Sequence, residues 1–277
     1  MSTALTFARA GHQVVATMRK PSEAPELHDA ATKEKLLIRI YQMDVDSDIS
    51  VSSTTDKIVK EMGFIDVLVN NAGIERTGAI EDTQLAEFRA VMETNYFGVI
   101  RCVHAVLTSM RKQKKGCIIN VASVAGRIAS AAMAPYSASK FALESFSEIL
   151  AQEVKSLGIR VAIVEPGIID TPMSQHITLK PPHSNYSHQQ RLSALFTASL
   201  KHPVAPDIVA NKMLEIVDSG TGQLRHLVGP DAIPFLAWRQ SMNDEAWINL
   251  AALDDDAWYE RIKGDFGMEV RPVATVS

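Results

Sequence analysis

Residues 117–166 read CIINVASVAGRIASAAMAPYSASKFALESFSEILAQEVKSLGIRVAIVEP, and the order of elements within them decides the fold. Cys117 to Val121 is a short apolar run, which is typical of a buried strand. Ala, Leu, Glu and Ser then dominate Tyr136 to Leu157, which predicts a helix. A second apolar run, Arg160 to Val164, stops at Pro166. A strand, a helix and another buried strand in this order predict a βαβ unit with two parallel strands.

The same alternation continues in both directions along the chain. It predicts a three-layer, doubly wound α/β fold of the Rossmann type, with helices on both faces of one parallel sheet. Further strands are expected at residues 13–18, 36–43, 65–69 and 223–228, and further helices at 3–10, 49–62, 85–110 and 207–218. We divide the chain into a main domain, residues 1–230, and a C-terminal extension of short packed helices, residues 231–277.

Composition excludes several classes of function. The chain has 277 residues, of which 28 are Lys or Arg and 32 are Asp or Glu, so its formal charge is −4. That charge gives no reason to expect nucleic-acid binding. No stretch reaches the roughly 20 apolar residues that a membrane span needs. Cys102 and Cys117 stand in apolar settings without metal-ligand spacing, which indicates buried thiols and a cytoplasmic protein.

The central chemical signal is the pair Tyr136 and Lys140. A spacing of four places both side chains on one face of a helix. A phenol ionises near pH 10, so the pKa must fall by about two to three for acid–base work near neutrality. A nearby ammonium group stabilises the phenolate, and we therefore expect Lys140 to lower the pKa of Tyr136.

Further small and polar residues follow the predicted strands. Ser123 comes just after one strand, where open α/β sheets bind their ligands, and we expect it to face the same cleft as Tyr136. Asn70-Asn71-Ala72-Gly73 follows an earlier strand and allows a flat ligand to approach the backbone. Asn95 lies inside the helix predicted at 85–110, where asparagine is unfavourable, which indicates a bend or a polar role.

These motifs together resemble the short-chain dehydrogenase/reductase family. They run in the family's order and spacing through about residues 10–230: Asn70-Asn-Ala-Gly73, Asn95, Ser123, Tyr136-x-x-x-Lys140 and Pro166-Gly167 with Thr171. The resemblance implies that residues 1–230 are an NAD(P)-binding catalytic domain. It implies an oxidoreductase that interconverts a carbonyl and a secondary alcohol, and a homodimer or homotetramer. An isomerase or epimerase built on the same Tyr/Lys pair is disfavoured at this length.

The resemblance also assigns roles to individual residues. It implies that Tyr136 is the general acid/base, that Lys140 lowers its pKa and holds the nicotinamide ribose, and that Ser123 orients the carbonyl. Asn95 would hold a water in a proton relay. The cofactor-binding residues that it implies are Asn71, Ala72 and Gly73 on the adenine-ribose side, Asp44 at the adenine, and Gly167, Ile169 and Thr171 at the nicotinamide end.

The cofactor type depends on the end of the second strand of this fold. A carboxylate there favours NAD(H), because it binds a free ribose 2′-hydroxyl. Here the strand runs into Arg19 and Lys20 without an acid, and two cations favour a 2′-phosphate. The sequence therefore predicts NADP(H), with NAD(H) possible; the alternative is a solvated basic turn.

The start of the sequence departs from the family pattern. The family begins with a strand and a Gly-rich turn, T-G-x-x-x-G-x-G, which holds the cofactor pyrophosphate at a helix N-terminus. Met1 to Ala10 already reads as the helix after that turn. The missing strand would be central, so we expect a gap between the strands at Val14 and Val67 and weak cofactor binding.

Two explanations of this departure stay open. One is a start that lies further upstream, which we favour because the catalytic set is complete. The other is a degenerate relative that acts by binding or dimerising instead of by catalysis.

The sequence contains few patterns that specify the substrate. Similarity to hydroxysteroid- and retinol-dehydrogenase-like members near Ala16-Thr-Met-Arg19 and in the tail suggests a lipophilic small molecule. Residues 172–205 are rich in Pro, His, Ser and Gln and are interpreted as an irregular lid. The apolar face of Leu192 to Leu200 fits a pocket cover or the core equally well.

Two other groups of residues are given structural interpretations. The spacing of His176, His183 and His188 does not suit a metal site, and no metal is expected. For the three tail tryptophans we favour packing over the lining of a pocket; they are Trp238, Trp247 and Trp258.

Overall fold

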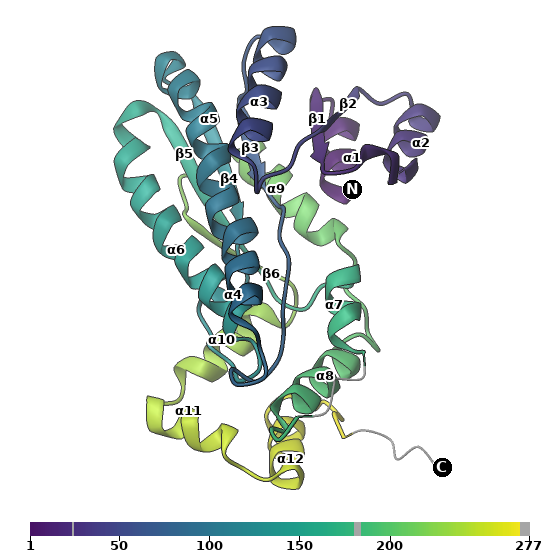
Figure 1. Cartoon of the computed structure of the whole chain (residues 1–277), viewed down its shortest axis with the longest axis vertical. Coiled ribbons are helices and arrows are strands. Elements are labelled where there is room, and N and C mark those ends of the chain that lie inside the picture. The colour runs from purple at the N-terminus through teal and green to yellow at the C-terminus, as the bar shows by residue number, and fades with distance from the viewer. Residues whose placement is uncertain (24, 180–183, 272–277) are drawn as a thin grey trace.

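The computed structural model describes residues 1–23, 25–179 and 184–271, and it has the predicted parallel α/β architecture (Figure 1). Strands β3 (Val67–Asn70), β4 (Gly116–Val121), β5 (Ile159–Pro166) and β6 (Arg225–Val228) form one parallel sheet in that order. Strands β1 (Val14–Met18) and β2 (Ile38–Gln42) form a second, two-stranded parallel sheet.

The break between the two sheets lies where the sequence predicts a gap. Among the described residues, no hydrogen-bonded strand pair joins β1 to β3. Side chains connect the two parts instead, because Phe7 of α1 (Ser2–Arg9) belongs to the same apolar cluster as Val14 of β1 and Val67 of β3. Helix α1 also packs along α9 (Asp207–Ser219). Apolar packing therefore holds the β1–β2 pair in place without a continuous hydrogen-bond ladder.

Helices cover both faces of the four-stranded sheet. On one face, α5 (Gly98–Gln113) and α6 (Ala134–Val154) pack on Ile118 and Ile163, both fully buried. On the other face, α9 packs on Ile119 and Val164. Adjacent strand residues point to opposite faces, so the continuous apolar runs of β4 and β5 fill both layers of the core.

The long helix predicted at residues 85–110 is interrupted at Asn95. It consists of α4 (Leu85–Met92), a π-helical turn (Glu93–Phe97) and α5. A π-helical turn is a local bulge that often occurs at functional sites. The bend expected at Asn95 is therefore confirmed.

The remaining elements include two corrections. Helix α3 (Asp48–Met62) was predicted, whereas α2 (Pro25–Glu34) was not. Residues 172–205 were expected to be irregular, but they contain α7 (Pro172–Ile177) and α8 (His188–Ser199). Thr171 caps α7 and Pro172 occupies its first turn, so the local sequence does start a helix there. Short 3₁₀ turns cover Pro21–Glu23, Val124–Gly126 and Lys155–Leu157.

The C-terminal extension forms the expected short helices, α10 (Ala232–Gln240), α11 (Asp244–Ala251) and α12 (Asp255–Phe266). Trp247 Nε1 donates to the carbonyl of Ala129 at 2.9 Å. Arg191 of α8 binds Asp255 and the carbonyls of Ala251 and Leu253. These contacts fasten the extension to the main domain at the lower end of the molecule in Figure 1. Among the described helices, none has the length and apolar character needed to cross a bilayer.

Candidate active site

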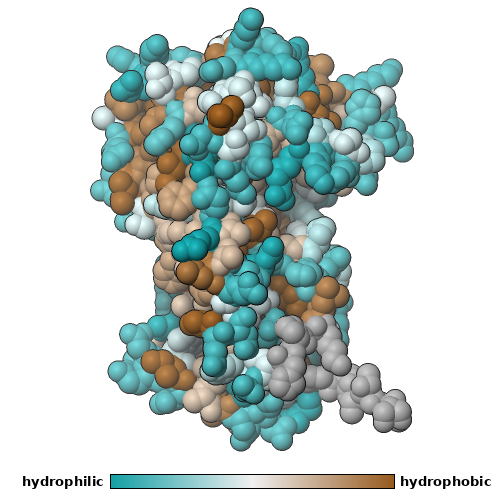
Figure 2. All heavy atoms as spheres, viewed as in Figure 1, coloured by the Kyte–Doolittle hydropathy of each residue, from teal (hydrophilic) through white to brown (hydrophobic). Residues whose placement is uncertain are grey.

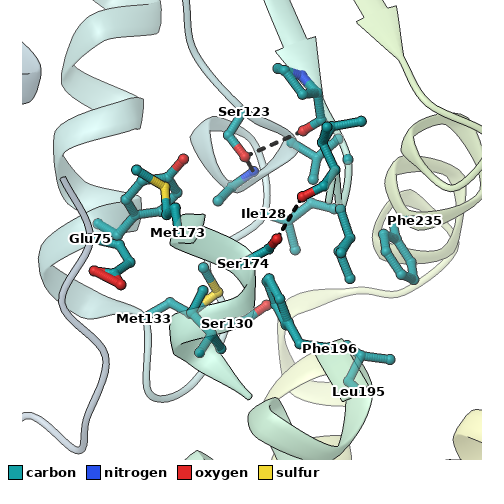
Figure 3. A pocket seen from close by; sticks show the side chains of 18 of the residues that line it. Glu75, Ser123, Ile128, Ser130, Met133, Met173, Ser174, Leu195, Phe196 and Phe235 are labelled. Carbon is teal, nitrogen blue, oxygen red and sulfur yellow. Dashed lines mark hydrogen bonds between the residues drawn. The ribbon is translucent and has the colours of Figure 1, made fainter. Parts of the chain in front are cut away.

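A cavity of about 760 Å³ lies at the carboxyl ends of β4 and β5. The segments that follow these two strands form part of its wall, and α6, α8 and the extension form the rest. In Figure 3, Ser123 lies at one end, Glu75 on one side, and Phe235, Leu195 and Phe196 on the opposite side. Ligands of open α/β sheets bind at this edge, so the cavity is the candidate active site.

Ser123, Tyr136 and Lys140 all line this cavity. Ser123 follows β4, and its Oγ accepts from the backbone N–H of Ala125 at 3.2 Å and donates to the carbonyl of Pro166 at 3.4 Å. Tyr136 and Lys140 project from α6, with Lys140 Nζ 5.6 Å from the centre of the Tyr136 ring. The structure therefore places Ser123 and Tyr136 in one cleft, as the spacing predicted.

The predicted direction of the Tyr136 pKa is wrong. Burial raises the pKa of the phenol to about 12, although a hydrogen bond with Ser123 acts in the opposite direction. Lys140 Nζ donates to the carbonyl of Val121 at 2.7 Å, and burial lowers the pKa of Lys140 to about 8. The phenol is therefore protonated at neutral pH, and it is a weaker acid than a free tyrosine.

Asn95 connects the segment after β3 to the catalytic helix. Its Oδ1 accepts from the N–H of Ile74 at 2.8 Å, and its Nδ2 donates to the carbonyl of Ile74 at 2.9 Å. Nδ2 also donates to Ser139 Oγ at 3.0 Å, and Ser139 donates to the carbonyl of Tyr136. A Cβ on Gly73 would lie 3.3 Å from Asn95 Oδ1, so a glycine suits the position where the backbone passes the Asn95 side chain.

The other predicted site residues divide into two groups. The first group lines the cavity, and its members are Asn71, Gly73, Gly167, Ile169 and Thr171. Ala72, Arg19 and Asp44 are not among the lining residues. Arg19 is exposed just after β1, and the Asp44 carboxylate accepts from the N–H of Asp46 in a local turn.

The cavity suits one end of a dinucleotide better than the other. Lys140, Gly167 and Thr171 supply a cation, a close backbone approach and a hydroxyl for a nicotinamide and its ribose. Met1, Ser2 and Thr3 line the cavity at the start of α1. The first N–H groups of a helix are free to bind an anion, so this end can receive a phosphate.

Several lining residues were not predicted. Glu75 follows the Asn71–Gly73 motif closely, and Met133 and Met173 lie near it (Figure 3). The three tail tryptophans pack on neighbouring aromatic rings, as we expected. All three also line the cavity, which we did not favour. On α8, Leu192, Leu195 and Phe196 likewise do both.

Comparison with known proteins identifies the family. Residues 1–182 match the family model described as short chain dehydrogenase. The chain belongs to the short-chain dehydrogenase family. It is 34% identical to oxidoreductase BOA17 of Botryotinia fuckeliana over 249 residues, which cover 87% of this chain and 89% of that protein.

Two further relatives support the same conclusion. Retinol dehydrogenase 8 of Bos taurus is 35% identical over 240 residues, which cover 83% of this chain and 76% of that protein. The crystal structure of a short-chain dehydrogenase from Streptomyces avermitilis has a TM-score of 0.75 at 29% identity, with 95% of this chain and 92% of that chain covered. This short-chain dehydrogenase is thus an oxidoreductase acting on CH–OH groups, and a nicotinamide cofactor fits the family.

The histidines of the segment after β5 have separate partners in this short-chain dehydrogenase. His176 Nδ1 lies 2.6 Å from Glu75 Oε1, and His188 Nε2 lies 3.1 Å from the carbonyl of Ala251. His183 lies outside the described residues.

A group of buried charges on α6, β5 and β6 lies next to Lys140 in this short-chain dehydrogenase. Glu144 is one helical turn after Lys140, and its Oε2 accepts from Arg225 Nε at 3.0 Å. Glu165, the penultimate residue of β5, has no exposed surface, and its Oε1 lies 3.5 Å from Arg127 Nη1. Burial and then the nearby charge of Glu165 raise the pKa of Glu144 to about 7, against the effect of Arg225.

This raised pKa predicts a pH-dependent stability. The folded chain binds a proton on Glu144 more tightly than the unfolded chain does, so the stabilisation is complete below about pH 4.3 and is lost as the pH rises through about 7. Between those values the free energy of unfolding should fall by at most about 1.4 kcal/mol per pH unit relative to Glu144→Gln. Lys140 has a pKa of about 8, so its titration changes the free energy of unfolding only above this pH range.

Urea unfolding at several pH values measures this difference. Glu148→Gln is the matched control, because Glu148 binds the same Arg225 at 2.6 Å from an exposed position. The control should keep the wild-type pH dependence. Parallel curves for wild type and Glu144→Gln would contradict the assignment.

Proposed function

We propose that this chain is an NADP(H)-dependent reductase or dehydrogenase of an apolar ketone or secondary alcohol. The observation that carries the proposal is the placement of Ser123, Tyr136 and Lys140 together in one largely apolar cavity. The nicotinamide, when bound, supplies or accepts the hydride. Ser123 orients the substrate oxygen and Tyr136 donates the proton to it, so a carbonyl becomes a secondary alcohol.

The size and lining of the cavity support an apolar substrate. Phe196, Phe235 and Trp238 form part of the wall, and the volume of about 760 Å³ suits a bulky small molecule. The relative retinol dehydrogenase 8 has a name that points to the same class of substrate. On the family resemblance alone, we further propose that Asn95 holds a water in a proton relay and that Asp44 contacts the adenine. We also propose that the main domain ends at residue 230.

Turnover with purified protein tests the proposal. NADPH consumption is measured with a panel of apolar ketones, and NADP⁺ reduction with the matching alcohols. The rival function is a relative that binds or dimerises without catalysis. Ligand binding in the cavity without turnover of any member of the panel would favour that rival.

The preference for NADP(H) rests on Arg19. It is exposed just after β1 and has no acidic partner among the described residues, whereas Lys20 pairs with Glu23 at 2.8 Å. Arg19→Asp should therefore reduce the ratio of kcat/KM for NADPH over NADH by about ten- to a hundredfold, the value of a hydrogen bond to a charged group. Lys20→Gln is the control and should change the ratio less. A wild-type preference for NADH would refute the NADP(H) proposal.

We also propose a homodimer or homotetramer and a cytoplasmic, reducing location. Phe97, Phe141 and Ile149 are large apolar residues with 43% to 53% exposure on the π-helical turn and α6. Figure 2 shows hydrophobic side chains gathered on this face over α4–α6. Burial of such a face supports an interface between copies. The buried free thiols of Cys102 and Cys117 suit a reducing compartment.

A further inference from the structure

One carboxylate stands out in the wall of the apolar cavity. The charged side chains among the described lining residues are Glu75, Lys140 and Arg191. Arg191 is occupied by Asp255 and two backbone carbonyls, and Lys140 donates to the carbonyl of Val121. Glu75 is different, because only one of its two oxygens accepts a hydrogen bond from the described part of the chain.

Glu75 is held in place by a side chain that is mostly exposed to solvent. Its Oε1 is 2.6 Å from Nδ1 of His176, a side chain that is 63% exposed. Its Oε2 is 3.8 Å from Arg76 Nη1, which is beyond hydrogen-bond distance. Glu75 itself is only 7% exposed. His176 thus holds one oxygen of this largely buried carboxylate, while the other oxygen accepts no hydrogen bond from the described residues.

A largely buried carboxylate with one oxygen left without a hydrogen bond favours a donor on the ligand. A carboxylate in apolar surroundings loses its hydration, and an opposite charge with a hydrogen bond offsets that loss. Glu75 is also close enough to Tyr136 for its charge to raise the pKa of that phenol. A single small molecule can therefore reach both groups within the cavity that they share.

We propose that Glu75 is a specificity-determining residue, and that the substrate is an apolar ketone or secondary alcohol with an ammonium group near the reacting carbon. The ammonium donates to Glu75 Oε2 while the oxygen of the reacting carbon meets Ser123 and Tyr136. The alkyl part lies against Phe196, Phe235 and the other apolar wall residues. The turnover test of this inference rests on the proposed function. The binding test needs only the cavity.

Turnover is compared for three stable alcohols that differ at one position: 2-aminododecan-3-ol, dodecane-2,3-diol and dodecan-3-ol. In the reaction the C–H hydride passes to NADP⁺ and the hydroxyl proton leaves through Tyr136, which gives the ketone. The kcat/KM of the amino alcohol should exceed that of dodecan-3-ol by about tenfold or more. In Glu75→Gln this ratio should fall to near one.

Glu87→Gln is the matched control. Glu87 lies 3.7 Å from Arg76, so this variant also removes a carboxylate from the same arginine, but Glu87 is half-buried and does not line the cavity. The control should keep the wild-type ratio. A wild-type ratio near one, or a ratio that survives in Glu75→Gln, overturns the inference, and a preference for the diol over the amine overturns the ammonium assignment.

A binding measurement separates this inference from the proposed function. Dodecylamine and dodecan-1-ol are titrated against the fluorescence of Trp238, Trp247 and Trp258, which all line the cavity. Glu75→Gln should weaken dodecylamine binding about tenfold relative to dodecan-1-ol. No turnover of any of the three alcohols would refute the proposed function, while equal loss for both binding probes would refute the role of Glu75.

Discussion

Replacement of Tyr136 with phenylalanine is expected to lower turnover by about 10²–10⁴-fold, the usual contribution of a general acid. The phenol lines the cavity beside Ser123, and it carries its proton at neutral pH. Phenylalanine preserves the ring and its packing but has no proton to donate. Initial rates of NADPH-dependent ketone reduction measure the loss.

Two comparisons make this result specific to proton donation. Dinucleotide affinity, followed by fluorescence titration, should stay close to the wild-type value, because Lys140 and the glycine-containing segments are unchanged. Phe88 lies on α4, outside the cavity lining, so Phe88→Leu controls for a general loss of activity in an altered chain. Activity of Tyr136→Phe within a few fold of wild type would refute the role of Tyr136.

Local patterns in the sequence were sufficient to predict much of the fold and the placement of Ser123, Tyr136 and Lys140 together. Continuous apolar runs such as Cys117 to Val121 gave the strands because parallel strands are buried on both faces. The four-residue spacing predicted that Tyr136 and Lys140 share a helix face, because residues four apart lie one helical turn from each other. The gap between the strands at Val14 and Val67 was predicted from the order of the elements, because each strand's neighbours are set by topology.

The features that escaped prediction depend on contacts between distant segments. The cavity wall joins Glu75, which follows β3, to Phe235 and Trp247 in the extension, and no local pattern relates these positions. The direction of the Tyr136 pKa likewise depends on burial by the whole surrounding wall, which a pairwise reading of Tyr136 and Lys140 leaves out. The composition of residues 172–205 suggested a loop, which was wrong at α7, where Thr171 caps a helix. The helical spacing of Leu192, Leu195 and Phe196 in the same segment was confirmed by α8.

Asn95 shows how a local anomaly in sequence can mark a tertiary contact, and its removal should have the largest effect on stability. The side chain has no exposed surface and makes three hydrogen bonds, two to the backbone of Ile74 and one to Ser139. Asn95→Ala leaves the Ile74 groups without their partner. Buried polar groups left unpaired cost about 1–3 kcal/mol each, so the free energy of unfolding should fall by roughly 2–5 kcal/mol in total.

Urea unfolding measures this loss against Asn243→Ala. Asn243 is also an asparagine that accepts from a backbone N–H, that of Ala246 at 2.8 Å, but it caps α11 at the surface. Loss of such a cap costs about 1 kcal/mol, so Asn95→Ala should be clearly more destabilising. The activity of Asn95→Ala should also fall, because the Ile74 segment carries Gly73 and Glu75 into the cavity and Ser139 binds the carbonyl of Tyr136. Equal losses of stability in the two variants would mean that the π-helical turn holds its shape without the Asn95 amide.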